Sequence, residues 1–283
     1  MTRNIQLLVI DPQNDFCDVP EAWQPTSPLT GERIRPALPV AGAHADMQRT
    51  AAFIRAQGAH LAGITLTLDS HQRYDIAHPA FWQQGDGSAV APFTTITAAQ
   101  VRAGQWLPRN PSVMPRVLAY LDALERQGRY TLMVWPLHCE IGTWGHGVHV
   151  DVLAACGDWQ ANTQRAVQHV FKGTNPWTEH YSAIEAEVPD ATDPDTALNT
   201  RLLTQLDTAD LLLIAGEASS HCVRATTEHI VAHLPSGRPE RVVLLTDCMS
   251  PVAGFEAQHD AFMAQMQSKG LKLQKSSQIR LAP

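Results

Sequence analysis

The hydrophobic positions of the chain form short continuous runs, separated by longer stretches with a helical repeat. The runs are rich in Leu, Ile and Val and cover residues 5–10, 61–68, 131–135, 168–171, 211–215 and 242–246. Each run predicts a strand that is buried on both faces. Between them, apolar residues recur at helical spacing over 41–57, 113–126, 222–234 and 255–269. This alternation predicts an α/β fold, in which helices cover both faces of a parallel sheet.

Three segments rich in Pro and Gly interrupt the alternation, at 20–39, 81–115 and 188–195. Periodicity fails there and turn residues accumulate, so we expect loops around the core. The chain has 283 residues, yet it contains no long Gly/Ser linker, no repeat and no low-complexity tract. We therefore predict a single domain over residues 1–283, with elaborations.

Composition and charge exclude several classes of protein. Hydrophobic residues make up 44% and charged residues 17% of the chain, which is enough apolar material for a large core. The formal net charge is -7, and there is no basic tract that could follow a phosphate backbone. The apolar runs are far too short to cross a bilayer of about 30 Å. We therefore expect neither a nucleic acid nor a membrane as a partner.

The N-terminal residues lack the features of a signal peptide. Arg3 is followed by an apolar run that Asp11 ends before a cleavage site could form. The cysteines are odd in number and have no short paired spacing: Cys17, Cys139, Cys156, Cys222 and Cys248. This pattern is typical of reduced thiols, so we expect a cytoplasmic protein in which one thiol is free for chemistry.

Polar residues that directly follow the strand runs are the candidate functional residues, because ligands bind outside the carboxyl ends of parallel strands. Asp11 is placed to act as a base, although an Asp there also commonly forms a turn or caps a helix. Lys172 must either reach solvent or meet a carboxylate, since an unpaired buried ammonium is costly. Cys222 begins a predicted helix after Gly216 and a small polar turn, where a thiolate is favoured. This position favours a nucleophile over inert packing.

A metal site is the second candidate. Asp69 and His71 are two residues apart at a strand end, so their side chains point to one side and suit a divalent metal. His138 follows another run and would leave a coordination position for water or substrate. The alternatives are a hydrogen-bonded Asp–His pair, a capping or core role for His138, and Cys139 as the ligand instead.

Six short motifs occur in a fixed order along the chain. They are D-x-Q-N-D-F at 11–16, D-x-H at 69–71, W-P-x-H-C at 135–139, K-G-T at 172–174, Y-S-A at 181–183 and G-x-A-x-x-x-C-V at 216–223. Together they resemble the nicotinamidase and isochorismatase superfamily of cysteine hydrolases over nearly the whole chain. The D-x-H and W-P-x-H-C pair resembles the metal-dependent nicotinamidase (pyrazinamidase) branch in particular.

The resemblance implies a three-layer α/β/α fold with a six-stranded parallel sheet, and it implies roles for individual residues. The catalytic triad would be Asp11, Lys172 and Cys222, and the metal ligands would be Asp69, His71 and His138, with His78 added in some members. It also implies a cis peptide at Glu217–Ala218 and an oxyanion hole made by the backbone N–H groups of Ala218 and Cys222. Zinc is the default metal, and iron or manganese would also suit these ligands.

The activity implied is hydrolysis of nicotinamide to nicotinic acid and ammonia through a Cys222 thioester. Phe16, Trp135 and Tyr181 are candidates for packing against the substrate ring, or they are ordinary core residues. Two features depart from the family pattern: an insertion at about 82–134, and Ser220-His221 in place of an Asp–aromatic pair.

Two alternatives remain. The first is a related hydrolase acting on another amide, a carbamoyl group or a cyclic imide, and the second is a metal-binding scaffold without catalysis. The segment at 188–195 and the stretch before residue 41 are long enough to cover the pocket or to build an oligomer contact, and we expect a homo-oligomer.

Overall fold

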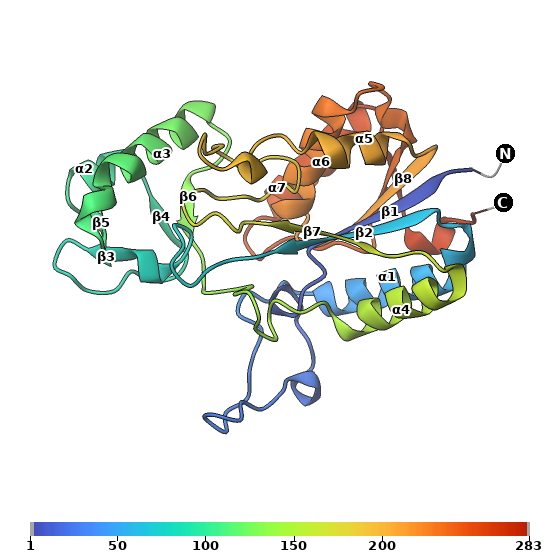
Figure 1. Cartoon of the computed structure of the whole chain (residues 1–283), viewed down its shortest axis with the longest axis horizontal. Coiled ribbons are helices and arrows are strands. Elements are labelled where there is room, and N and C mark those ends of the chain that lie inside the picture. Colours follow the sequence, from blue (N-terminus) through green and yellow to red (C-terminus); the bar gives the residue numbers. More distant parts are fainter. Residues whose placement is uncertain (1–2, 282–283) are drawn as a thin grey trace.

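The computed structural model describes residues 3–281 and shows a twisted sheet between two layers of helices (Figure 1). All neighbouring strands of the six-stranded sheet run parallel. Their spatial order is β10 (Lys272–Gln274), β9 (Val242–Leu245), β8 (Leu211–Gly216), β1 (Ile5–Ile10), β2 (Gly63–Asp69) and β7 (Gln168–Lys172). The predicted three-layer α/β/α fold is confirmed.

The two helix layers bury opposite faces of the sheet. One layer contains α1 (Ala43–Gln57) and α4 (Val150–Thr163), and the other contains α5 (Thr200–Asp207), α6 (Cys222–His233) and α7 (Glu256–Ser268) (Figure 1). Successive residues of β1 alternate between the two cores: Leu7 and Val9 pack with the first layer, whereas Leu8 and Ile10 pack with the second. Because both faces are covered, the strand is apolar at every position except Gln6, whose side-chain amide donates a hydrogen bond to Thr208.

The run predicted at 131–135 is a strand, but its predicted place in the parallel sheet is wrong. Its core, β6 (Leu132–Val134), pairs antiparallel with β4 (Thr94–Ile96) in a separate two-stranded sheet. The sixth parallel strand is instead β10, at the sheet edge. β10 has two exposed residues, Lys272 and Gln274, around the half-buried Leu273, so it produces no continuous apolar run.

The region 81–115 is also more ordered than the predicted loop. It contains β3 (Trp82–Gln84), β4, α2 (Ala98–Arg102) and β5 (Trp106–Pro108), and α3 (Met114–Gln127) follows. These elements surround a core of their own, in which Phe81 and Trp82 pack with Leu121 and Leu124 of α3. The insertion therefore forms a distinct lobe at one end of the molecule (Figure 1).

The other two predicted loops are largely irregular. The segment 20–39 contains only the short 3-10 helix Glu21–Trp23 and a bridge between Thr26 and Arg33, and it projects away from the α1–α4 layer (Figure 1).

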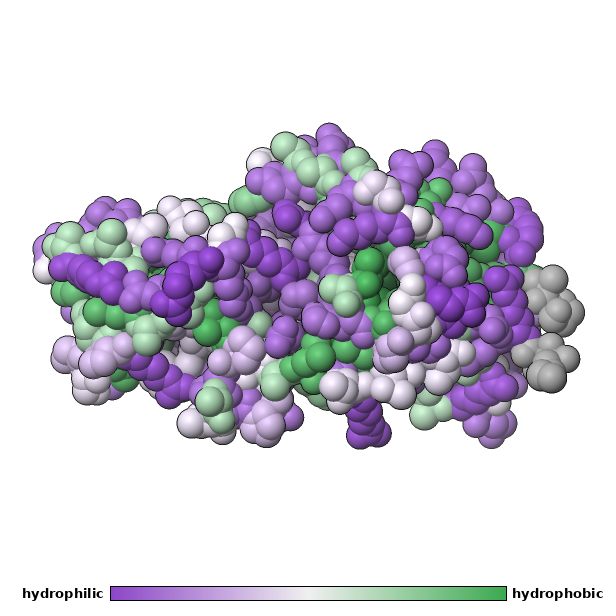
Figure 2. All heavy atoms as spheres, turned by 90° about the horizontal axis from the view of Figure 1, so that it is seen from above, coloured by the Kyte–Doolittle hydropathy of each residue, from purple (hydrophilic) through white to green (hydrophobic). Residues whose placement is uncertain are grey.

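Seen from the side of α5, α6 and α7, polar residues cover most of the surface, with apolar residues at the floor of a hollow (Figure 2). Within residues 3–281, no helix is long and apolar enough to span a membrane.

The strand register brings the predicted functional residues together. Ile10, just before Asp11, lies beside Gly216, which begins the turn to Cys222. Asp69 lies beside Lys172 on the neighbouring pair of strands. All four strands run in the same direction, so these side chains meet at the carboxyl ends of the strands.

The contact between Gly216 and β1 gives a first prediction. At Gly216 φ is +120°, and a Cβ atom would lie 2.0 Å from the carbonyl oxygen of Ile10. Gly216→Ala should therefore lower the free energy of unfolding by at least about 2 kcal/mol in a urea titration. Gly63→Ala is the matched control on β2, because nothing lies within 4 Å of its added Cβ. Equal urea midpoints for the two variants would show that β1 can move away from the turn.

Candidate active site

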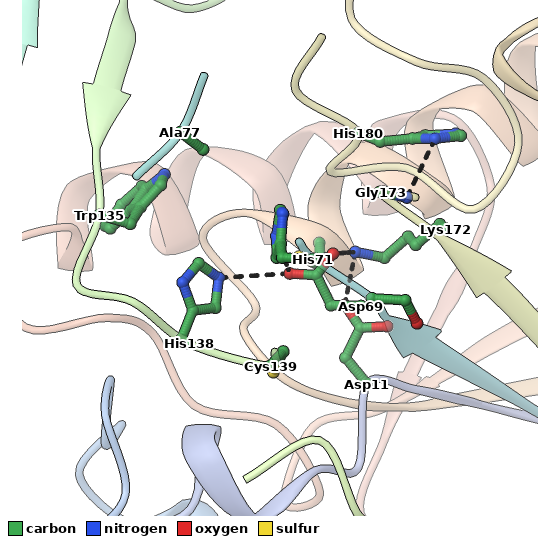
Figure 3. A network of polar contacts seen from close by, with 12 residues as sticks. Asp11, Asp69, His71, Ala77, Trp135, His138, Cys139, Lys172, Gly173 and His180 are labelled. Carbon is green, nitrogen blue, oxygen red and sulfur yellow. Dashed lines mark hydrogen bonds and ion pairs between the residues drawn. The ribbon is translucent and has the colours of Figure 1, made fainter. Parts of the chain in front are cut away.

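A buried ammonium group links three of the predicted residues. Nζ of Lys172 lies 2.8 Å from Oδ2 of Asp11, 3.0 Å from Oδ1 of Asp69 and 3.6 Å from Sγ of Cys222. Asp11, Asp69 and Lys172 point toward one another from the ends of β1, β2 and β7 (Figure 3). The sequence left open whether Lys172 reaches solvent, and the structure shows that it pairs with two carboxylates instead. Lys172 thus contacts both other members of the proposed triad.

Burial and charge set the protonation of this group. Burial lowers the pKa of Lys172, but Asp11 and Asp69 raise it well above its ordinary value, so the ammonium keeps its proton. Burial raises the pKa of Asp11, and Lys172 opposes that rise. Thr67 donates a 2.5 Å hydrogen bond to Oδ1 of Asp11, which holds the carboxylate in place.

The Cys222 thiol differs from the sequence-based expectation of a thiolate. It begins α6, yet burial raises its pKa well above the ordinary value, and only Lys172 acts strongly in the opposite direction. The resting group is therefore a thiol. Lys172 contacts both this thiol and Asp11, so Asp11 is the carboxylate positioned to take the thiol proton.

The turn before α6 exposes two backbone donors. The cis peptide that the resemblance implies is present at Glu217–Ala218. The N–H groups of Ala218 and Cys222 donate to no protein acceptor within residues 3–281, and both residues line the same pocket. Free N–H groups beside a nucleophile are the arrangement that stabilises an oxyanion.

Three buried histidines form a cluster next to the triad. One ring nitrogen from each of His71, His78 and His138 lies within 4.8 Å of the others. Oδ2 of Asp69 lies 3.0 Å from Nε2 of His71 and 3.3 Å from Nε2 of His138 (Figure 3). Asp69 therefore connects the cluster with Lys172. The alternative ligand Cys139 is buried but is not part of the cluster.

The cluster fits a divalent metal, because each histidine has its Nδ1 tied to an acceptor. Nδ1 of His71 lies 3.0 Å from Asp75, that of His78 3.1 Å from the carbonyl of Gln72, and that of His138 2.8 Å from the carbonyl of Pro136. Nε2 of His71 and of His138 lies beside Asp69, and Nε2 of His78 lies 3.3 Å from Nδ1 of His138, so each Nε2 atom has only residues of the site as partners. Histidines whose Nδ1 is held by an acceptor and whose Nε2 faces the site are typical of metal ligands.

The pKa shifts of His78 and His71 run in opposite directions, so His78 is neutral and His71 carries a proton. Burial, together with the neighbouring His71 and His138, lowers the pKa of His78 to about 2. Burial alone would also lower the pKa of His71, but the carboxylates of Asp69 and Asp75 raise it well above its ordinary value. A metal dication would take the place of that proton.

A narrow pocket of about 20 Å³ opens onto Cys222, Asp69 and His138. Phe16, Trp135 and Tyr181, the predicted ring-packing residues, line it. The indole N–H of Trp135 donates a 3.0 Å hydrogen bond to the Tyr181 hydroxyl, which fixes the relative position of the two rings.

Three residues of the site were not assigned from the sequence. Asp75 orients His71 and lies four residues after it, which is the only sequence signal for it. His221 lines the pocket, and burial lowers its pKa to about 4, so it is neutral. Glu179 also lines the pocket, and burial raises the pKa of its carboxyl to about 8.

Comparison with solved structures shows which proteins have a similar fold. A nicotinamidase/pyrazinamidase of Acinetobacter baumannii superposes with a TM-score of 0.62 at 20% identity, covering 98% of each chain. The yeast nicotinamidase has a TM-score of 0.59 at 19% identity, with 95% of this chain and 99% of that one covered. A pyrazinamidase of Pyrococcus horikoshii in complex with zinc has a TM-score of 0.54 at 19% identity, with 96% and 99% covered.

The chain has the nicotinamidase fold. No protein-family model and no curated protein matches the sequence. The chain thus shares its fold with nicotinamidases over nearly their full length, although at most 20% of the residues are identical in these three structures.

The contact between Lys172 and Cys222 gives a second prediction. Lys172→Met removes the cation that opposes the rise in the pKa of the thiol. Alkylation of Cys222 by iodoacetamide at neutral pH should slow by at least about tenfold, since each unit of pKa costs a tenfold loss of thiolate. The rate is measured by mass spectrometry of the Cys222 peptide.

The matched control is Lys272→Met, which removes an exposed lysine from β10. Circular dichroism establishes that both variants are folded. Identical alkylation rates in the two variants would mean that Lys172 does not influence the thiol.

Proposed function

We propose that the chain is a metal-assisted cysteine amidohydrolase that converts nicotinamide to nicotinic acid and ammonia. The observation that carries the proposal is the contact of Lys172 with both Asp11 and Cys222, beside a pocket that Cys222 lines together with Asp69 and His138. Phe16, Trp135 and Tyr181 line the pocket, and their rings suit a flat aromatic amide.

In the first step Sγ of Cys222 attacks the carboxamide carbon while Asp11 takes the thiol proton. The S–C bond forms as the carbonyl π pair moves to oxygen, and the N–H groups of Ala218 and Cys222 donate to that oxyanion. Lys172 stays protonated and balances the charge of Asp11 and Asp69. The oxyanion then collapses, the C–N bond breaks, and Asp11 returns the proton to nitrogen, so that ammonia leaves.

The second half of the reaction hydrolyses the thioester. Asp11 takes a proton from a water molecule, whose oxygen attacks the thioester carbon. The C–S bond breaks, and the proton on Asp11 returns to the thiolate of Cys222. Nicotinic acid is released, and the starting protonation states are restored.

Asp69, His71, His78 and His138 would hold the metal. When bound, a divalent metal supplies a Lewis acid that orients the substrate by ligating its pyridine nitrogen. Zinc is the metal we propose, supported by the ligand types and by the zinc complex of the Pyrococcus pyrazinamidase, which has the same fold. Phe16 and Trp135 would then pack against the ring.

A larger amide is the second candidate substrate, favoured by one feature. A cavity of about 230 Å³ adjoins the pocket and shares Trp135, Tyr181 and His221 with it. Residues of the insertion, including Thr95 and Tyr130, line it. Ammonia release from nicotinamide, pyrazinamide and bulkier aromatic amides, compared as kcat/KM, distinguishes the two candidates.

Cys222→Ala should reduce ammonia release from nicotinamide by at least about 1,000-fold, because no other group can form the thioester. Cys156→Ala is the matched control: it removes a buried thiol from α4, remote from the triad, and should retain turnover. An enzyme-coupled ammonia assay measures both. Full turnover by the Cys222 variant would eliminate the thioester mechanism.

Asp75→Asn tests the metal site. Oδ1 of Asp75 accepts the N–H of Ala77, and asparagine keeps that bond while presenting an NH₂ group to Nδ1 of His71. His71 must then carry its proton on Nε2, which blocks ligation. Zinc affinity should fall by about 10- to 100-fold, measured by competition with a chelating dye.

The control for this change is Asp86→Asn, at an exposed turn with the same local hydrogen bond, to the N–H of Ser88. Its zinc affinity should equal that of the unmodified chain. A full zinc affinity in Asp75→Asn would place the metal away from His71.

A further inference from the structure

The turn that carries Ala218 is held by a second segment, which the proposed mechanism does not use. This segment is the loop 248–252, after β9. The N–H of Gly216 donates to the carbonyl of Cys248 over 2.9 Å, and at the other end the N–H of Val252 donates to the Ser220 hydroxyl over 3.1 Å. The loop therefore runs along the turn over its whole length.

Ser250 in the middle of this loop binds both neighbours of Ala218. Its N–H donates to Oε2 of Glu217 over 3.1 Å, and its carbonyl accepts the N–H of Ser219 over 2.9 Å. Ala218 lies between these two anchored residues. The position of its N–H group is thus set from both sides by one serine.

The hydrogen bonds of Ser250 to the turn include one to a buried carboxyl group, that of Glu217. The side chain is fully buried, and no cation contacts it within residues 3–281. Its Oε1 atom has no hydrogen-bond donor among the described residues. Asp46 of α1 is bonded to the same serine, because the Ser250 hydroxyl donates to its Oδ2 over 2.5 Å.

Two neighbouring carboxyl groups in a dry environment share one proton. Burial, and then the charge of Asp46, raise the pKa of Glu217 well above its ordinary value, so Glu217 is the protonated member. Asp46 is the charged member: it pairs with Arg49 and accepts a 2.5 Å hydrogen bond from the Ser250 hydroxyl. Asp18 and Cys17 are the other titratable groups that face the pair.

We propose that Glu217 and Asp46 form a carboxylic acid–carboxylate pair that, through Ser250, positions the N–H of Ala218 toward the oxyanion. Glu217 is a positioning residue, since it acts through Ala218 and does not touch the substrate. This inference rests on the proposed function. It gives α1, on the opposite side of the sheet from α6, a role in the chemical step.

Glu217→Leu tests the pair by keeping the bulk of the side chain and removing its hydrogen bonds. With nicotinamide as substrate, kcat should fall by about 10- to 100-fold, because a displaced donor loses much of its effect on the transition state. KM should stay within about threefold, since the oxyanion forms only after binding. Glu217→Gln should recover most of kcat, because its NH₂ can donate to Asp46 while its oxygen accepts from Ser250.

A second measurement uses pyridine-3-carbaldehyde, the aldehyde analogue of the substrate. The thiol of Cys222 adds to its carbonyl: the S–C bond forms, and the oxygen takes the proton that sulfur loses. Inhibition by the aldehyde should weaken in Glu217→Leu by about the same factor as kcat, because the adduct resembles the transition state. Alkylation of Cys222 by iodoacetamide should stay unchanged, since the triad is intact.

Glu187→Leu is the matched control. It removes another buried carboxyl, which makes no hydrogen bond to the turn 216–220, and kcat should be retained. Equal kcat values for the unmodified chain, Glu217→Leu and the control would overturn the positioning role alone. Absence of nicotinamide turnover in the unmodified chain would instead overturn the proposed function. A loss in Glu217→Leu that Gln does not recover would also overturn the pair, because Gln keeps the side-chain volume and both hydrogen bonds.

Discussion

The site depends on one interaction, the burial of a single ammonium group between two carboxylates. Lys172 can lose its contact with water only because Asp11 and Asp69 replace it, and the two carboxylates can lie close together only because Lys172 separates their charges. Each of the three comes from a different strand. The register of β1, β2 and β7 is therefore coupled to the chemistry, because a slip of one residue would turn one of these side chains to the other face of the sheet.

Much of the fold could be predicted from the sequence, because strands buried on both faces produce continuous apolar runs. Where an element is only half buried, that signal is absent, as in β10 with its exposed Lys272 and Gln274. The run at 131–135 shows the opposite problem. Its residues are as apolar as those of a central strand, since β6 is buried in the lobe of the insertion, and the sequence does not state which core an apolar run joins.

The sequence predicted which residues form the site, but it did not predict their protonation states. Strand ends and motif order placed Asp11, Lys172 and Cys222 together without any coordinates. The protonation state of Cys222 needed the structure, because burial outweighs the favourable helix start. The roles of Asp75 and Glu217 could not be predicted for a similar reason. A carboxyl group in a turn has no distinctive neighbours in the sequence, and its importance comes from the buried group that it faces.

The lobe of the insertion is attached to the pocket by a specific bond, in which the hydroxyl of Tyr120 on α3 accepts the N–H of Glu179 over 3.1 Å. Glu179 is part of the pocket wall, and Trp135 directly follows the last strand of the lobe. The lobe is consequently not a module that could be removed without disturbing the pocket wall. Substitutions in the core of the lobe would therefore also shift the residues of the pocket wall that a ligand contacts.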